Sequence, residues 1–290
     1  MIAARQIFLS LAVVLATPHF SVLAQGAPRV HAYEVVNART GHRSLLLPTI
    51  HVSAKGLVQP SEGILGGARA LIVEHLFVPS DPAVLSKERA PWAATLTDSE
   101  LDALRARARC ADNSPQQVEN ALRRASVQMA NMIAYTSCSV AGKISRDELL
   151  ASSAEGRGMA ILPLEDAYWV EKQRRRLPAS FQAEGLKWIL RREVDVVLSN
   201  VVTAFNRGNF DKVAELTRES FGSEAAAQLH YSLMVAERNL KWMEVLPAYL
   251  DAGSVVVAVG AMHFPGPDGL VQLLRARGYL VRSTTVPGSL

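Results

Sequence analysis

Two apolar runs near opposite ends of the chain each end in a histidine. Residues 45–50 are mostly aliphatic and lead to His51, and residues 255–262 are mostly aliphatic and lead to His263. Runs of this kind predict strands, and the second has the composition of a strand buried on both faces. In an open α/β sheet, polar side chains just past the strand ends lie in the crevice where ligands bind. The pattern therefore predicts that the two imidazoles converge. The alternative is two unrelated histidines, each hydrogen-bonded to nearby backbone.

The rest of the first eighty residues predicts further strands. Partly alternating residues 30–36, a polar turn, and residues 43–49 predict an N-terminal hairpin that delivers His51. Residues 70–73 are a short apolar run with Glu74 at its exit. A carboxylate leaving an apolar strand is costly to bury unpaired, so Glu74 is either a functional group or half of a structural ion pair.

The middle of the chain predicts helices. Capping-box patterns at 97–100 and 114–117 open helices over 101–110 and 114 to about 135. Further helices are predicted over 146–155, 181–200 and 210–219, with one short strand at 159–162. We expect these helices to form a cap over about 95–225.

The last third of the chain alternates between predicted helices and predicted strands. A long helix over 225–250 is followed by a strand at 254–259, a helix at 268–277 and a strand at 279–282. Such alternation predicts an α/β fold with a mixed central sheet, flanking helices and the helical cap inserted in the middle of the chain.

The N-terminus has the pattern of an export signal. Arg5 precedes an apolar core at 7–16, and small or medium residues at 22–24 predict cleavage after Ala24. The mature domain would then be 25–290, periplasmic or secreted, with no stable membrane insertion after cleavage. An uncleaved membrane anchor is the alternative, although the core is short for a transmembrane helix.

Composition excludes some classes of function. A formal net charge of +4 is too small to argue for nucleic acid as a partner. The densest basic cluster, 172–176, has no interleaved aromatic residues and fits a solvated helix end. The two cysteines, Cys110 and Cys138, are allowed to form a disulfide in an exported protein, but sequence does not place them within bonding distance.

Several motifs together resemble the TraB/GumN family. They are Pro-Thr-Ile-His at 48–51, Val-Glu at 73–74, Arg-Asn at 238–239, Val-Gly-Ala-Met-His at 259–263, Pro-Gly-Pro-Asp-Gly-Leu at 265–270 and Leu-Arg-Ala-Arg-Gly-Tyr-Leu-Val at 274–281. The Gly-x-x-His segment and the motifs after it are the most specific part. The resemblance runs from about residue 30 to the end, is loose at 147–150 and 164–165, and extends distantly to Tiki ectodomains and to erythromycin-esterase and ChaN-like folds.

The resemblance implies a metal-dependent hydrolase acting on peptides. His51, Glu74 and His263 would hold a divalent manganese, cobalt or zinc ion with an open position for water. Arg238 would bind a substrate carboxylate or a developing oxyanion. Asn239 would donate to the same oxygen or orient a ligand. A metal-free arrangement remains open, with Glu74 as the general base and the histidines polarising the substrate.

Two departures from the family pattern bear on activity. Pro48 stands where the family has Gly, and it removes a backbone donor. His75 follows Glu74 where an apolar or small residue is expected, and as a strand neighbour it should point to the opposite face. The alternative function is therefore a non-catalytic binder that sequesters a peptide or small-molecule ligand.

Overall fold

The computed structural model describes residues 27–76, 85–110, 113–140 and 143–290. The predicted signal peptide and its cleavage site lie outside these ranges, so they stay predictions. Within the described ranges, no helix is long and apolar enough to cross a membrane.

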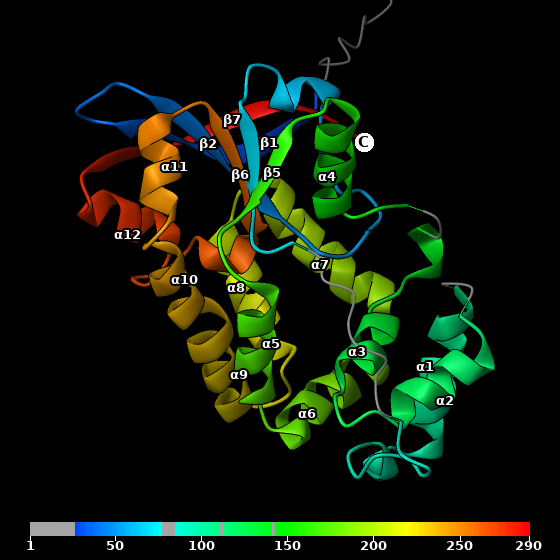
Figure 1. Ribbon diagram of the computed structural model, residues 1–290. Coiled ribbons are helices and arrows are strands. Elements are labelled where there is room, and N and C mark those ends of the chain that lie inside the picture. Colours follow the sequence, from blue (N-terminus) through cyan, green and yellow to red (C-terminus); the bar gives the residue numbers. More distant parts are fainter. Residues whose placement is uncertain (1–26, 77–84, 111–112, 141–142) are drawn as a thin grey trace, which may run out of the picture.

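A seven-stranded mixed sheet forms the upper part of the molecule (Figure 1). Its order is β3-β7-β1-β2-β6-β4-β5. The strands are β1 (Arg29–Asn37), β2 (Arg43–Thr49), β3 (Gln59–Pro60), β4 (Ala70–Val73), β5 (Ala160–Pro163), β6 (Val255–Gly260) and β7 (Tyr279–Ser289). The predicted hairpin is the antiparallel pair β1–β2, whereas β2, β6, β4 and β5 run parallel. The carboxyl ends of these four strands therefore lie at one edge of the sheet.

Helices cover both faces of the sheet. On one face, α11 (Leu246–Ala252) and α12 (Leu270–Ala276) pack against the strands, and Leu250 and Leu274 share a core with Val257. On the other face, Leu150 of α4 (Arg146–Gly156) joins a second core with strand residues. All six residues of β6 are buried, as its uninterrupted apolar pattern predicts.

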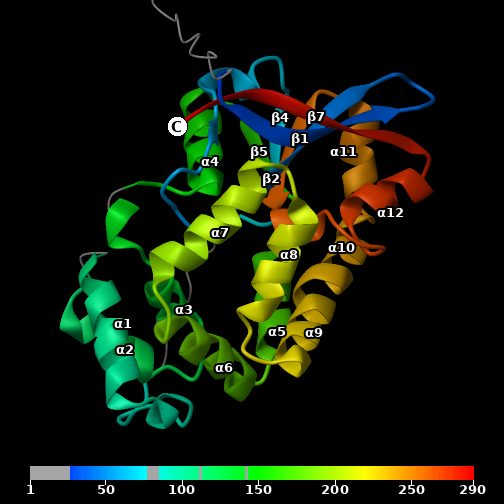
Figure 2. The same ribbon diagram turned by 180° about the vertical axis from the view of Figure 1, so that it is seen from behind.

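The remaining helices lie beyond the carboxyl edge of the parallel strands (Figure 2). They are α1 (Asp98–Cys110), α2 (Pro115–Leu122), α3 (Gln128–Ala134), α5 (Ala167–Arg175), α6 (Ala179–Leu190), α7 (Val194–Asn206), α8 (Phe210–Glu219), α9 (Glu224–Tyr231) and α10 (Glu237–Trp242). Helices α1 to α11 lie between β4 and β6 in sequence, with β5 among them. The predicted fold class, an α/β protein with a mixed sheet and helices inserted mid-chain, is confirmed.

Three predicted helices were too long. The pattern over 114–135 forms α2 and α3, and that over 181–200 is divided between α6 and α7. The pattern over 225–250 forms α9, the π-helical turn η4 (Ser232–Ala236) and α10, and a turn at 243–245 separates these from α11. The apolar period continues across the first two breaks because both pieces bury residues in the same core. At these two breaks Ser126 accepts from Gln128 N, and Arg192 donates to Trp188 O.

A disulfide joins Cys110, at the end of α1, to Cys138, in the 3-10 turn η3 (Cys138–Val140). It encloses α2 and α3, which are short helices. Disulfides are typical of proteins in oxidising compartments outside the cytoplasm.

Candidate functional site

The three predicted site residues at strand exits come together. His51 follows β2, Glu74 follows β4, and His263 ends the 3-10 turn η5 (Ala261–His263) after β6. Since β6 lies between β2 and β4 and all three run parallel, their carboxyl ends deliver these side chains to one place. His51 Nε2 is 3.7 Å from Glu74 Oε1, and His263 Nε2 is 3.9 Å from the same oxygen.

Gly260 forms the floor of this cluster. A Cβ atom at this position would lie 3.2 Å from both Glu74 Oε1 and His51 Nε2 and 3.7 Å from His263 Cδ2. The backbone N–H of Gly260 donates to Glu74 Oε1 over 2.7 Å. The absence of a side chain therefore lets the two imidazoles and the carboxylate approach one another.

His263 is a buried, neutral imidazole. Its side chain packs on Trp242, with ring centroids 4.2 Å apart, and Nδ1 lies 2.7 Å from Asn239 Oδ1. An amide oxygen accepts only, so Nδ1 carries the proton and Nε2 is the unprotonated nitrogen. Burial, reinforced by the charge of Arg238, lowers the pKa of His263 to about 3 against the opposing effect of Glu74. The Nε2 lone pair is thus unprotonated at neutral pH and accepts a long hydrogen bond, 3.4 Å, from Arg238 Nη1.

His51 is the accessible member of the cluster, with 63% of its side chain exposed. Its Nδ1 lies 3.1 Å from Asp147 Oδ2, in the first turn of α4. Desolvation lowers the pKa of this imidazole, but the hydrogen bond to Asp147 and the charge of Glu74 outweigh it and raise the pKa. Solvent screens part of this shift because the ring is exposed.

Arg238 joins two buried carboxylates. Its Nη2 donates to Glu74 Oε2 over 2.6 Å and also to Glu165 Oε1, while Nε donates to the same Glu165 oxygen over 2.9 Å. The π-helical turn η4 immediately precedes Arg238, and Met234 O in that turn accepts from Nη1. The ion pair between Arg238 and Glu74, one of the two predicted alternatives for Glu74, is therefore present.

The two carboxylates differ in their titration. Burial favours a raised pKa for Glu74, but the charges of Arg238 and His51, with the hydrogen bond from Gly260 N–H, outweigh it and hold the pKa far below its usual range. Burial raises the pKa of Glu165 despite its bonds to Arg238. Glu165 Oε2 and Trp242 Nε1 are both buried, and neither has a hydrogen-bond partner among the residues that the structure describes. Glu74 is therefore a fixed negative charge, whereas Glu165 is the more easily protonated acid.

Arg238 and Asn239 make their contacts within the protein. The Asn239 amide nitrogen donates to His263 O over 3.1 Å and to Asp268 O over 2.7 Å, and its oxygen faces His263. These are the contacts of a residue that orients an imidazole. The Arg238 side chain is only 7% exposed, so little of its guanidinium is open to a ligand.

Pro48 and His75, the two residues that depart from the family pattern, lie apart from the imidazole cluster. Pro48 is buried within β2, and its carbonyl accepts from Arg146 Nη1 over 2.8 Å. In a strand the N–H and the carbonyl of one residue point to the same side. An N–H at position 48 would therefore point toward the side on which Arg146 donates to Pro48 O. His75 Nδ1 lies 3.3 Å from Leu76 O, outside the cluster.

Two residues of the site were not predicted, Asp147 and Glu165. Glu165 follows β5 as Glu74 follows β4, and its backbone N–H donates to Glu74 O over 3.0 Å. A rule that examined every strand exit would have found it. The Asp147 contact to His51 spans 96 positions and has no local signal.

The predicted metal ligands do not form a complete site as they stand. In the described parts of the chain, no group of three or more His, Cys, Asp or Glu side chains has the arrangement needed to hold a metal ion. Two ligands in a tetrahedral site are about 3.4 Å apart for bonds of about 2.1 Å. The measured 3.7 Å and 3.9 Å are a few tenths of an ångström longer. The donor types suit a divalent ion, but in this arrangement Arg238 contacts both Glu74 Oε2 and His263 Nε2.

Comparison with known proteins gives a family and no individual relative. No curated protein and no solved structure matches the chain. The family model described as TraB/PrgY/gumN matches residues 35–283, which include every residue of the site described above. The chain therefore belongs to the TraB/PrgY/gumN family.

Proposed function

We propose that this protein is an exported, metal-dependent hydrolase that acts on peptides. The observation that carries the proposal is the convergence of His51 and His263 on one oxygen of Glu74 above Gly260. Each imidazole also has its Nδ1 held by a polar side chain. Metal-binding histidines are commonly oriented in this way through their second nitrogen.

The electrostatics of Glu74 favour a ligand over a general base. A general base works best when its pKa is near the working pH. Arg238 and His51 hold the pKa of Glu74 far below that range. A permanently ionised carboxylate beside a neutral imidazole is instead a suitable donor pair for a divalent cation.

Two carboxylates of the site share one guanidinium. Glu74 and Glu165 both pair with Arg238, and His51 stands between Glu74 and Asp147. We propose that His51, Glu74 and His263 hold a manganese, cobalt or zinc ion, while Asn239 and Asp147 orient the imidazoles. Such an ion, when bound, would activate water for nucleophilic attack near neutral pH.

The substrate class and location follow from less direct arguments. A peptide is the first choice by resemblance to Tiki ectodomains. The disulfide fits an oxidising compartment, and the N-terminal pattern predicts export, so we propose a periplasmic or secreted protein.

A non-catalytic binder of a peptide or small ligand is the second candidate. The observation that favours it is the saturation of Arg238, whose guanidinium contacts two carboxylates and a carbonyl and has little capacity left for a substrate oxyanion. Catalysis would then require Arg238 to exchange one of these partners during turnover.

The test combines elemental analysis with a peptide-library digest. Chelator-free protein exported to the periplasm is analysed for bound metals and incubated with the library plus manganese, cobalt or zinc. We expect about one ion per chain and cleavage that a chelator abolishes. His263→Ala should lose both, and His75→Ala, which removes a neighbouring histidine outside the cluster, should keep both. Wild-type protein with neither metal nor cleavage would favour the binder.

A further inference from the structure

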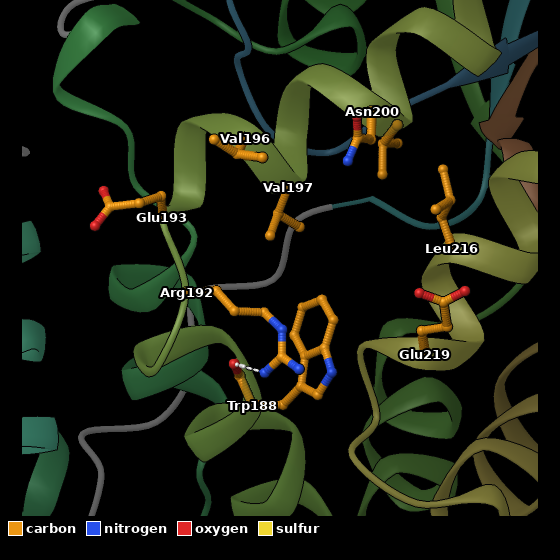
Figure 3. A pocket seen from close by; sticks show the side chains of 9 residues that line it. Trp188, Arg192, Glu193, Val196, Val197, Asn200, Leu216 and Glu219 are labelled. Atoms are coloured by element: carbon orange, nitrogen blue, oxygen red, sulfur yellow. Dashed lines mark hydrogen bonds between the residues drawn. The ribbon is translucent and has the colours of Figure 1, made fainter.

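A concave site lies between α6, α7 and α8, and none of the strand-exit residues lines it (Figure 3). It has a volume of about 440 Å³, within the range of small-ligand pockets. Its apolar lining comes from Trp188, Val196, Val197, Val201 and Leu216. The remaining lining residues are Arg192, Glu193, Asn200 and Glu219.

Arg192 is a fixed part of the pocket wall. Its guanidinium lies 4.1 Å from the centre of the Trp188 ring, and Nη1 donates to Trp188 O over 2.8 Å. Glu193, the neighbouring residue, directs its carboxylate away from this pair in Figure 3. With one guanidinium and two carboxylates, the lining carries one net negative charge.

Glu219 is an exposed carboxylate of the pocket wall. It is the last residue of α8, where the helix dipole disfavours a negative side chain. No described residue makes a hydrogen bond or ion pair with its carboxylate, whereas Glu215, one turn earlier on the same helix, pairs with Lys212. A cation bound beside Glu219 would offset the helix dipole and form an exposed ion pair.

We infer that this pocket binds a basic side chain of a peptide, with an aliphatic stem against the valines and Leu216 and a cationic head at Glu219. A lysine side chain has this shape, since its stem packs on apolar surface while its ammonium stays polar. An acidic side chain would meet the carboxylate of Glu219, and Arg192 is already engaged by the Trp188 ring and carbonyl.

Helix α8 connects the pocket to the strand-exit site. Phe210, its first residue, packs on Phe264 with ring centroids 6.1 Å apart, and Phe264 follows His263. Glu219 lies nine residues further along, about 14 Å at about 1.5 Å per residue. If the proposed peptidase function holds, the basic side chain of the substrate would be held apart from the strand-exit site. Binding in the pocket does not itself require hydrolysis.

The test measures binding of three capped pentapeptides, Ala-Ala-X-Ala-Ala with X as lysine, norleucine or glutamate. Binding is followed by NMR titration of the Trp188 indole N–H, assigned with Trp188→Phe. Norleucine keeps the aliphatic stem without the charge. We expect the lysine peptide to bind roughly three- to fivefold more tightly than the norleucine peptide, as suits a partly exposed ion pair, and the preference to weaken with salt.

Matched variants assign the effect to Glu219. Glu219→Gln should remove the preference for lysine, whereas Glu215→Gln, which removes the same charge from the same helix outside the pocket, should keep it. Leu216→Ala should weaken lysine and norleucine peptides alike. Equal binding of lysine and norleucine peptides, preference for the glutamate peptide, or a lysine preference that survives Glu219→Gln would overturn the inference. These binding measurements require neither a metal nor cleavage. The pocket inference can therefore fail while the hydrolase proposal stands, and the reverse.

Discussion

At the scale of single residues, the chemistry of this protein centres on Arg238. A buried guanidinium needs carboxylate partners, and here two are supplied from the exits of adjacent strands, Glu74 after β4 and Glu165 after β5. This arrangement keeps Glu74 ionised and fixes the oxygen that both imidazoles face. Removal of one partner leaves the remaining charges poorly compensated.

Glu165→Gln should therefore destabilise the protein. The amide keeps the size of the side chain but loses the charge that balances Arg238, so we expect a loss of about 1–3 kcal/mol in the free energy of unfolding, measured by urea denaturation. Glu244→Gln, at an exposed pair with Lys241, is the control and should change stability by less than about 0.5 kcal/mol. Equal effects of the two substitutions would contradict this account of Arg238.

Gly260→Ala tests the floor of the imidazole cluster. Its φ of −55° is open to alanine, so the backbone should tolerate the change. The new Cβ would be 3.2 Å from Glu74 Oε1 and His51 Nε2, which must move by a few tenths of an ångström. We expect weaker zinc binding by calorimetry with a stability change below about 1 kcal/mol.

Gly156→Ala is the control for this substitution, because nothing lies within 4 Å of its Cβ position. It should leave zinc binding unchanged. Unaltered zinc binding in Gly260→Ala would mean that the cluster is not the metal site.

At the scale of elements, the first turn of α4 braces the exit of β2. Ser145 caps the helix, Arg146 donates to Pro48 O, and Asp147 holds the ring of His51. Consecutive residues of one helix thus hold both the strand and the side chain that follows it. The disulfide plays a comparable bracing part for α2 and α3, which are too short to be stable alone.

Loss of the disulfide should loosen α1 to α3. The bridge spans a sequence separation of 28, for which the chain-entropy model gives about 3–4 kcal/mol. We expect the double variant Cys110→Ser, Cys138→Ser to show a loss of that order in urea unfolding. Hydrogen exchange should accelerate mainly in α2 and α3. Reductant should reproduce the effect in wild-type protein and have no effect on the double variant; a reductant effect on the double variant would contradict this assignment.

At the scale of the whole molecule, the sheet and the helices beyond its carboxyl edge have separate cores. Two cores lie among the inserted helices, and two others lie on the faces of the sheet. His230 of α9 is partly exposed, although its Nδ1 atom is buried. Within the described residues this Nδ1 has no hydrogen-bond partner, and the ring packs on Phe221 with centroids 4.2 Å apart. This histidine makes stability depend on pH.

Protonation of His230 should destabilise the fold in mild acid. Burial, with the charges of Arg238 and Arg174, lowers the pKa of His230 to about 4. The unfolded chain takes up this proton below about pH 6.5, so between pH 6.5 and 4 it binds more protons than the folded state and stability falls as pH falls. We expect His230 to account for a loss of about 2 kcal/mol from pH 7 to pH 5.

His230→Gln should remove that part of the pH dependence in urea unfolding at the two pH values. His75→Gln controls for the loss of one imidazole. If His230→Gln loses as much stability as the wild-type protein between pH 7 and pH 5, protonation of His230 is not the cause of that loss.

The sequence by itself determined the strand exits and the family. Each of His51, Glu74 and His263 is the first strongly polar residue after an apolar run. Such a residue marks the end of a buried strand, because its side chain is costly to bury in an apolar core. Capping boxes at Thr97 and Ser114 form as predicted, because they depend on residues three positions apart. These features are local, and local spacing encodes them.

Only the tertiary structure decided the partners of those residues. Glu165 and Arg238 are 73 positions apart, and His51 and Asp147 are 96 apart, so no spacing rule links them. The breaks in the long helices and the pairing of Cys110 with Cys138 have the same origin. A period of apolar residues specifies which side of a helix is buried, whereas the packing of distant segments decides where that helix stops and which charges meet.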